Sequence, residues 1–339
     1  MIRKKTEIPT AVKDRHRGEE ALKIRKHRGD LQGLRLHAVE PSTLINSEHK
    51  GHHARCSVAS VRSGFVTVVG RPNVGKSSLI NAVVGTRVSI VSDKPQTTRR
   101  QVRGIVTRED GQVVFVDTPG LHKAESALGE RCNRSALDAA TGVDVVVLVV
   151  DATKPVGTGD RWVASRFAGA PFVVVVNKCD VAAPASVLAQ LAAVSEIPAS
   201  AYFPVSAATG SGVAALVSHL VAMLPEGGLL YPADALADAS GEQWIAELVR
   251  EHLLAVTRDE VPYSVATRAS TMDDGTVRCE IIVERESQKG IVIGRGGSVL
   301  SGARAHVRRH AGRSIKLEMV VTVDPDWQHR AERVERLGY

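Results

Sequence analysis

Residues 70–77 combine glycines, a lysine and a serine at a spacing suited to phosphate chemistry. They read GRPNVGKS and match the pattern GxxxxGK(S/T). A bound polyphosphate needs glycines that let backbone N–H groups approach its oxygens, and a cation near its terminal phosphates. Lys76 provides that cation, and the Ser77 hydroxyl is suited to Mg²⁺. An ordinary glycine-rich turn is the alternative, but the flanks FVTVV and SLINAVV predict a strand before the run and a helix after it. The predicted phosphate-binding residues are Gly70, Arg71, Pro72, Asn73, Val74, Gly75, Lys76, Ser77 and Ser78.

A second polar motif, NKCD, follows the apolar run FVVVV about 100 residues later. Open α/β sheets place ligand contacts at the carboxyl ends of their strands, which suits this motif to a nucleotide base. The Asp180 carboxylate can accept hydrogen bonds from the ring N–H and the amine of guanine, and adenine lacks that pair of donors. The motif is short, and a polar strand end with a capping Asp is its alternative; its order after GRPNVGKS favours guanine. The predicted base-site residues are Asn177, Lys178 and Asp180, with the SAATG residues Ser206, Ala207 and Ala208 closing over the base.

Two further segments are suited to sensing the terminal phosphate. The run DTPG follows the strand VVFV, where a carboxylate can hold Mg²⁺ and a glycine N–H can contact the γ-phosphate. The segment KPQTTRR lies between the expected phosphate-loop helix and the next strand, and Thr98 is preferred over Thr97 as a second Mg²⁺ hydroxyl. Taken alone, this segment would be a solvated basic loop. The predicted residues are Asp117, Thr118, Pro119 and Gly120, the switch I segment Gln96, Thr97, Thr98, Arg99 and Arg100, and the Mg²⁺ ligands Ser77, Thr98 and Asp117.

The segments between these motifs predict an α/β domain. Five short valine-rich runs alternate with amphipathic stretches from residue 64 to about residue 224: FVTVVG, VVFVD, VDVVVLVVD, FVVVVNK and AYFPVS. Such runs predict buried strands of a mostly parallel sheet with helices on both faces. The stretch 224–242 is rich in Pro, Gly, Asp and Ser, as linkers are. The predicted division is a basic, disordered arm (1–62), the α/β domain (63–226), a linker (227–241) and a smaller α+β domain (242–339).

The smaller domain contains a GxxG step. We expect a helix at 243–255, strands at 263–268 and 276–284, helices at 289–293 and 298–310, and a strand at 314–323. Glycines between two helices let a loop approach a sugar-phosphate backbone, and KH domains clamp about four nucleotides of single-stranded RNA in this way. A tight turn and a solvated helix face are the alternatives. The predicted RNA-binding residues are Gly294, Arg295, Gly296, Gly297, Arg304, Arg308 and Arg309.

Composition limits the class of protein. A chain of 339 residues is long enough for two domains, and its net charge of +7 favours a polyanionic partner without identifying one. The longest apolar run is too short and too polar to span a membrane, and the start MIRKK lacks the apolar core of a secretory signal, so we expect a cytoplasmic protein. The scattered cysteines, Cys56, Cys132, Cys179 and Cys279, indicate reduced thiols that serve packing. The cluster His49, His52, His53 and Cys56 completes no zinc pattern.

The motifs, in this order, resemble the translation-factor-related GTPases of the TrmE, Era and EngA group. The stretches VERESQKGIVIGRGG and DWQHRAERVERLGY further resemble the KH domain and C-terminus of the Era family, so the resemblance covers residues 64–339. It implies a type II KH fold, GTP hydrolysis, binding of single-stranded RNA near the 3′ end of small-subunit ribosomal RNA, and a role in assembling the small ribosomal subunit. It also implies peripheral membrane association and a monomer. Asn73 resembles an asparagine that coordinates K⁺ in several relatives.

This chain departs from the related proteins at two places. Residues 1–62 are an addition relative to Era proteins, and Leu121 lies where Ras-like GTPases have a glutamine that orients water. We therefore expect slow intrinsic hydrolysis and assign no general base. An RNA-binding protein that uses GTP only as a structural ligand remains an alternative. A TrmE-like or EngA-like protein is disfavoured because a single GTPase unit precedes the GxxG step.

Overall fold

The computed structural model describes residues 61–167 and 169–339. Two of the predictions fall on other residues: the disordered arm and the cluster His49, His52, His53 and Cys56 lie outside the described part of the chain.

The valine-rich runs form one six-stranded sheet with the strand order β2-β3-β1-β4-β5-β6. All neighbouring strands are parallel except β2, which runs antiparallel to β3. The predicted, mostly parallel sheet is therefore confirmed. Strand β2 was not among the five runs singled out, because its sequence VRGIVT is not a continuous apolar run. The strands are β1 (Arg62–Val69), β2 (Val102–Thr107), β3 (Gly111–Asp117), β4 (Val145–Asp151), β5 (Phe172–Asn177) and β6 (Ala201–Pro204).

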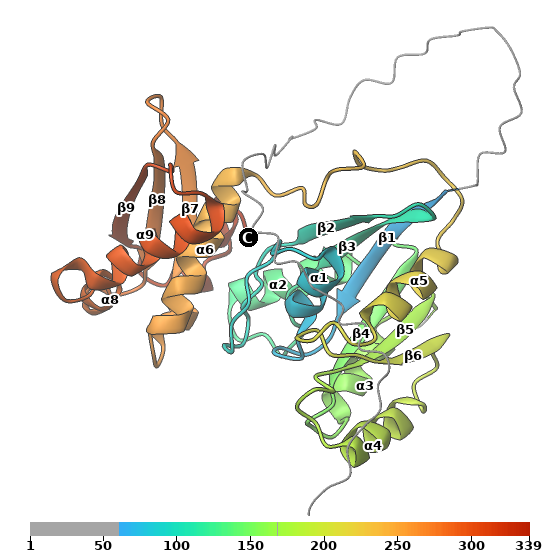
Figure 1. Cartoon of the computed structure of the whole chain (residues 1–339). Coiled ribbons are helices and arrows are strands. Elements are labelled where there is room, and N and C mark those ends of the chain that lie inside the picture. The colour runs from blue at the N-terminus through green and yellow to red at the C-terminus, as the bar shows by residue number, and fades with distance from the viewer. Residues whose placement is uncertain (1–60, 168) are drawn as a thin grey trace, which may run out of the picture. The chain divides into compact units, whose positions relative to one another are not determined.

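Helices cover both faces of this sheet, so its central strands are buried on both sides (Figure 1). One core joins Val68 and Val147 of the sheet to Leu79 and Leu216 of two helices on one face. The opposite core contains Leu148 and helical residues of α2, α3 and α4. The helices are α1 (Lys76–Val84), α2 (Ala127–Asp138), α3 (Thr158–Ser165), α4 (Pro184–Val194) and α5 (Val213–Met223).

The segment that follows α5 is attached to the sheet at several points. Glu226 forms an isolated bridge with Arg62, and Ala237 forms one with Gly104. The Gln112 side chain accepts hydrogen bonds from the backbone of Leu230 and Tyr231 at 2.8 and 2.9 Å. Between α5 and α6 this stretch contains only isolated bridges, turns and bends. It has the irregular backbone expected of a linker, and it lies along the first domain.

The C-terminal part has the order of a type II KH domain. Strand β8 pairs antiparallel to β7 and parallel to β9, and Figure 1 shows α6, α8 and α9 beside this three-stranded sheet. The apolar sides of these helices and of the sheet share one core. The order α, β, β, α, α, β predicted from the sequence is confirmed, with one short additional helix, α7, between α6 and β7. The elements are α6 (Gly241–Val256), α7 (Val261–Ser264), β7 (Ala266–Thr271), β8 (Val277–Val283), α8 (Glu286–Ile293), α9 (Ser298–Ala311) and β9 (Leu317–Val323).

The boundaries of some elements differ from the expected ones. The strand expected from residue 263 begins only at Ala266, because Pro262 lies in the first turn of the short helix α7, where its fixed φ suits a helix start. Helix α8 begins three residues before the expected 289, and β9 begins three residues after the expected 314.

A C-terminal segment packs against α2 of the first domain. It contains a 3-10 turn (Trp327–His329) and helix α10 (Ala331–Arg336), neither of which was predicted. Trp327 is fully buried and shares a core with Leu128 and Cys132 of α2 and with Tyr339. Across the described residues, every helix is too short or too polar to span a membrane.

Candidate functional site

The loop between β1 and α1 takes a backbone path that requires glycine at two positions. Gly70 and Gly75 have φ angles of 151° and 96°, in the region that side chains rarely adopt. A Cβ atom on Gly70 would lie 2.5 Å from the Val149 carbonyl oxygen, and one on Gly75 would lie 2.3 Å from Asn177 Nδ2. The glycines of the predicted phosphate loop are thus enclosed by protein.

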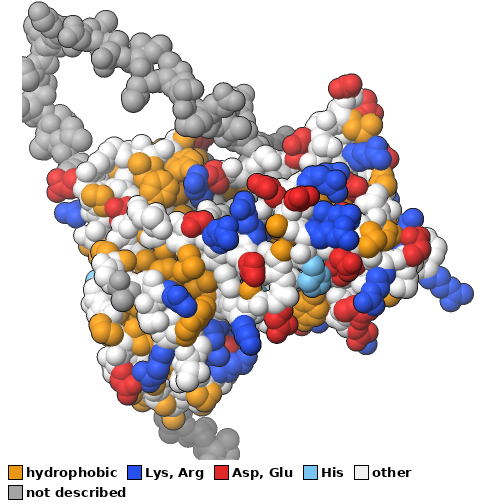
Figure 2. All heavy atoms as spheres, turned by 180° about the vertical axis from the view of Figure 1, so that it is seen from behind, with side chains coloured by type: hydrophobic (Ala, Val, Ile, Leu, Met, Phe, Trp, Pro, Cys, Tyr) orange, Lys and Arg blue, Asp and Glu red, His pale blue; other side chains and the backbone are white. Residues whose placement is uncertain are grey.

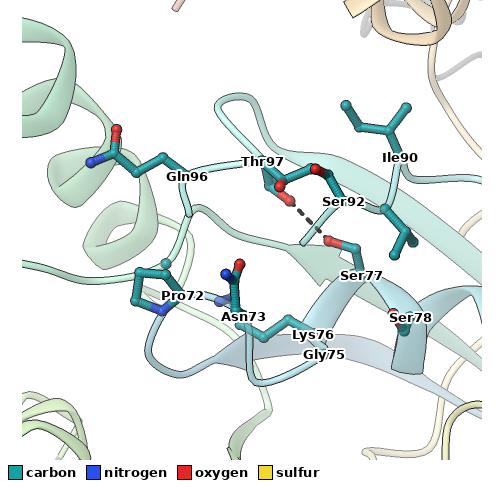
Figure 3. Close-up of a pocket in the computed structure, with 13 residues that line it drawn as sticks. Pro72, Asn73, Gly75, Lys76, Ser77, Ser78, Ile90, Ser92, Gln96 and Thr97 are labelled. Atoms are coloured by element: carbon teal, nitrogen blue, oxygen red, sulfur yellow. Dashed lines mark hydrogen bonds between the residues drawn. The ribbon is translucent and has the colours of Figure 1, made fainter. Parts of the chain in front are cut away.

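Lys76 is buried at the start of α1 and lies along the inside of this loop. Its Nζ donates hydrogen bonds to the carbonyls of Gly70 and Arg71 at 3.1 and 3.0 Å. Burial lowers the pKa of Lys76 to about 8, and the negative charge of Asp117 opposes part of that shift. The pocket beside it (Figure 3) is lined by all of the predicted loop from Pro72 to Ser78 except Val74, by Gln96, Thr97, Thr98 and Gly120, and by Ile90, Val91 and Ser92.

The three predicted Mg²⁺ ligands lie within hydrogen-bond distance of one another. Ser77 Oγ is 2.9 Å from Thr98 Oγ1, the dashed contact of Figure 3, and donates to Asp117 Oδ2 at 2.8 Å. The other carboxylate oxygen of Asp117 is buried and has no hydrogen-bond partner in the described part of the chain. Burial raises the pKa of this carboxyl, and the hydroxyls around it oppose the shift. An oxygen-only cluster with an unpartnered carboxylate oxygen fits a hard divalent cation.

Ser89 also belongs to this cluster, and it was not among the predicted residues. Its hydroxyl donates to Asp117 Oδ2 at 2.5 Å, and it is almost fully buried. A serine outside any recognisable motif carries no signal of such a contact.

The two predicted segments of the base site meet beside the phosphate loop. Asn177 donates to the Val74 carbonyl at 3.0 Å and accepts a hydrogen bond from the Ala207 N–H at the same distance. Ser206 Oγ donates to Asp180 Oδ1 at 2.7 Å, which fixes one oxygen of the carboxylate expected to bind guanine. The structure therefore joins the NKCD motif both to the phosphate loop and to the SAATG segment, of which Ala208 forms part of the turn.

Lys178 has two partners near the base site. Its Nζ donates to the Asn73 carbonyl and to Asp151 Oδ2, both at 2.7 Å. Burial acts to raise the pKa of Asp151, but hydrogen bonds from Lys178 and Thr153 outweigh it and hold that pKa below its usual value. Asp151 was not predicted, although an acidic residue that ends the buried strand β4 is a signal that could have found it.

The DTPG segment lies against the phosphate loop. Thr118 Oγ1 donates to the Val68 carbonyl at 2.8 Å. A Cβ atom on Gly120 would lie 2.9 Å from the Pro72 nitrogen. The next residue, Leu121, is 3% exposed and belongs to a hydrophobic core, so it offers no group for orienting water.

The switch I segment, residues 96–100, divides between two environments. Thr98 points to Ser77 and Asp117, whereas Arg99 donates to the carbonyls of Val265 and Tyr263 at 2.6 and 2.7 Å. The carbonyl of Thr97 accepts a hydrogen bond from Arg250 of α6, and Arg250 also pairs with Glu247. Arg99 is 3% exposed, so the interpretation of this segment as a solvated basic loop is wrong at that residue. One short segment thus contacts both the metal-ligand cluster and the KH domain.

The GxxG step forms an open loop between α8 and α9. Gly294, Gly296 and Gly297 have φ angles of 76°, 60° and 76°. A Cβ atom on Gly296 or Gly297 would meet nothing within 4 Å, whereas one on Gly294 would meet Val299. Arg308 and Arg309 are exposed on α9, and Arg304 Nε donates to the Leu317 carbonyl at 3.4 Å. The loop is accessible, and the roles of these arginines and of Arg295 in RNA binding stay predictions.

A nucleotide-phosphate loop in a mostly parallel sheet, followed by a KH domain, defines a class of GTP-binding proteins with an RNA-binding module. The family described as "50S ribosome-binding GTPase" matches residues 65–178. The family described as "KH domain" matches residues 260–328.

Individual relatives narrow this class to one family. GTPase Era of Mycolicibacterium paratuberculosis is 43% identical over 295 residues, which cover 82% of this chain and 99% of that protein. GTPase Era of Mycobacterium tuberculosis is 42% identical and covers 82% and 98% of the two chains. This chain belongs to the Era family of GTPases.

Two solved Era structures have the same fold. An Aquifex aeolicus Era variant bound to GDP·AlF4⁻ is 33% identical, with a TM-score of 0.78 over 82% of this chain and 99% of that one. Era in complex with MgGDPNP and nucleotides 1506–1542 of 16S ribosomal RNA is 35% identical, with a TM-score of 0.77 over the same shares of the two chains.

Proposed function

We propose that this chain is a GTP-hydrolysing switch that binds single-stranded RNA near the 3′ end of small-subunit ribosomal RNA and assists assembly of the small ribosomal subunit. One observation carries the proposal. Thr98 belongs to the metal-ligand cluster, while the adjacent residues Thr97 and Arg99 contact the KH domain. The Era relative bound to MgGDPNP and a 16S ribosomal RNA fragment supports the choice of nucleotide and RNA.

The nucleotide site would act mainly by positioning and by charge. Ser77, Thr98 and Asp117 would hold Mg²⁺, which supplies positive charge to the terminal phosphates when bound. Lys76 would exchange its contacts with loop carbonyls for phosphate oxygens, and the Gly120 N–H would contact the γ-phosphate. Asp180 would select guanine. Because Leu121 cannot orient water, intrinsic hydrolysis is slow.

Potassium is part of the proposal at Asn73. This residue has a φ of 63°, and its side chain donates to the Asp93 carbonyl at 2.6 Å, close to the switch I segment. K⁺ beside Asn73 would add positive charge where other GTPases use an arginine. Faster GTP turnover in KCl than in NaCl is expected, and equal turnover in the two salts would contradict the role.

Coupling to RNA would pass through the switch I segment. GTP and Mg²⁺ would order Thr98 and Gly120, and the hydrogen bonds of Thr97 and Arg99 would transmit that order to α6 and to the start of β7. Hydrolysis would release the arrangement. Such coupling requires that RNA bind the GTP form and the GDP form with different affinities.

The proposal also includes the domain bounds, the oligomeric state and the location of the protein. Residues 63–226 form the GTPase domain, 227–241 the linker and 242–339 the KH domain with its C-terminal segment. The protein acts as a monomer in the cytoplasm, with peripheral contact at the inner face of the cell membrane. On the face seen in Figure 2, Lys and Arg side chains are interspersed with Asp and Glu, so any membrane contact there would be local.

Titration of a single-stranded 3′-end RNA tests the proposal. The full chain is measured with a nonhydrolysable GTP analogue, with GDP, and as a Gly296→Asp variant. Tighter RNA binding in the GTP form, lost in the variant, is the expected result. Equal affinity in both nucleotide states, together with hydrolysis that RNA does not stimulate, would favour the alternative in which GTP is only a structural ligand.

A further inference from the structure

A second basic cavity lies apart from the nucleotide site. Its volume is about 500 Å³, and it lies between the residues that follow Thr98, helix α2 and the C-terminal segment. It shares no lining residue with the nucleotide pocket. The lining residues include Arg99, Arg100, Arg131, Arg134, Asp138 and Tyr339.

Positive charge exceeds negative charge around this cavity. Four guanidinium groups line it against two carboxylates, Asp138 and Glu335. An α-carboxylate on Tyr339 would bring the negative groups to three, still one fewer than the arginines. Within residues 61–167 and 169–339, none of the four arginines forms an ion pair with Asp or Glu. Their protein partners include backbone oxygens instead, as for Arg99 with Val265 and for Arg131 with Tyr339.

The four arginines differ in how available they are to a ligand. Arg99 is 3% exposed, and its guanidinium donates to the carbonyls of Val265 and Tyr263. Arg100 is half-buried, and Arg131 and Arg134 are exposed. The guanidinium groups of Arg100, Arg131 and Arg134 therefore keep N–H donors for a ligand.

We propose that this cavity binds a phosphate group, held by Arg100, Arg131 and Arg134. A phosphate monoester supplies several acceptor oxygens and up to two negative charges. The planar guanidinium group matches phosphate geometry with two parallel hydrogen bonds. The phosphate belongs either to a small compound or to the end of an RNA strand.

A ligand in this cavity would lie beside residues that follow the switch I threonine and the DTPG segment. Arg99 and Arg100 directly follow Thr98, and α2 follows the DTPG segment that contacts the phosphate loop. A phosphate between Arg100 and Arg131 would tie these two segments to the C-terminal residues. The occupied cavity would therefore hold the switch I segment on the KH domain.

Calorimetric titration of inorganic phosphate into the full chain, loaded with GDP and Mg²⁺, tests this site. The double variant Arg131→Gln/Arg134→Gln should bind phosphate at least about tenfold more weakly, because each charge-assisted hydrogen bond contributes that much to affinity. Arg166→Gln is the matched control, since Arg166 is an exposed arginine of α3's C-terminal end with no ion pair to any described residue.

Two results would overturn the site: no saturable phosphate binding, or equal affinity in the double variant and the Arg166→Gln control. The second result would place the phosphate at the empty γ-position beside GDP. Short RNAs with a 5′-phosphate or a 5′-hydroxyl then separate the two sources. A preference for the 5′-phosphate that the double variant removes identifies an RNA end, and equal binding of both RNAs identifies a free phosphate compound.

Discussion

The two glycine loops of this chain differ in what surrounds them. In the phosphate loop, a side chain at Gly70 or Gly75 would collide with Val149 or Asn177, so protein atoms already fill the space around the backbone. In the GxxG loop, a side chain at Gly296 or Gly297 would meet nothing. Both loops are suited to phosphate groups of a nucleotide or a nucleic acid, yet at these four positions only the first loop is packed against the rest of its domain.

The two loops therefore require glycine for different reasons. The phosphate loop needs glycine so that the domain can close around the loop, and ligand binding depends on that packing. At Gly296 and Gly297 the GxxG loop needs glycine so that a ligand's backbone can approach it, whereas a side chain on Gly294 would collide with Val299. Substitutions at Gly70 or Gly75 should therefore affect folding together with binding, and substitutions at Gly296 or Gly297 should affect mainly binding.

Gly75→Ala is expected to have the largest effect. Its Cβ would lie 2.3 Å from Asn177 Nδ2, at a φ of 96°. Left-handed strain and overpacking together should lower the free energy of unfolding by roughly 2 to 5 kcal/mol and abolish nucleotide binding. Denaturant titration and binding of a fluorescent GDP analogue measure both. Gly85→Ala is the control, since its φ is 77° in open space and strain alone should cost about 1 to 2 kcal/mol. Equal effects of the two variants would refute the packing argument.

Gly296→Asp should remove RNA binding while leaving the fold nearly intact. The position is open, and Asp tolerates a left-handed backbone, so the free energy of unfolding should fall by about 1 kcal/mol or less. RNA affinity, measured by fluorescence anisotropy, should fall at least about tenfold because the carboxylate repels phosphates. GTP affinity should not change. Gly296→Asn separates charge from bulk, and a large loss of stability in either variant would contradict an open loop.

The two loops should also differ in pH dependence. The pKa of Lys76 is about 8 in the folded protein, below its ordinary 10.5, and bound phosphates would raise it. Above pH 8, GTP binding therefore takes up a proton, and GTP affinity should fall by up to about tenfold per pH unit. In the same range the unfolded chain binds more protons, so the nucleotide-free fold gains stability as pH rises. RNA affinity of the GxxG loop should stay constant between pH 7 and about pH 9. GTP affinity that is equally constant would show that Lys76 keeps its proton.

Arg295→Gln should have the smallest effect. Loss of one phosphate contact should reduce the slope of RNA affinity against salt concentration by about 0.7 and leave GTP binding unchanged. Affinities measured over a series of KCl concentrations give this slope. Arg313→Gln, in the turn after α9, serves as the comparison variant, and an equal change in slope for both variants would remove the special role of Arg295.

The sequence was sufficient for the features that depend on local residue patterns. Continuous valine-rich runs become strands because helices cover both faces of the sheet, and the motifs GRPNVGKS, DTPG and NKCD carry their chemistry within a few residues. The clustering of Ser77, Thr98 and Asp117 was predicted for that reason. The KH element order was also predictable from alternating apolar periods.

Contacts between distant segments were not predictable. Arg99 is separated by 166 residues from Val265, whose contribution is a backbone carbonyl without any signature in the sequence. Ser89 and Asp151 support functional residues from outside the motifs. The burial of Trp327 against α2 depends on the packing of the whole C-terminal segment, which one amphipathic period cannot reveal.

The hydrogen-bond partners of Arg99 affect whether the KH domain can be replaced by that of another protein. Its two shortest hydrogen bonds end on main-chain oxygens, those of Val265 and Tyr263, and not on side chains. The side chains at these two positions can diverge without removing the acceptors, provided that the backbone keeps its path. A chimera that receives the KH domain of a distant relative should therefore retain this attachment, so the two domains can be exchanged by gene fusion while the arginine stays in the first.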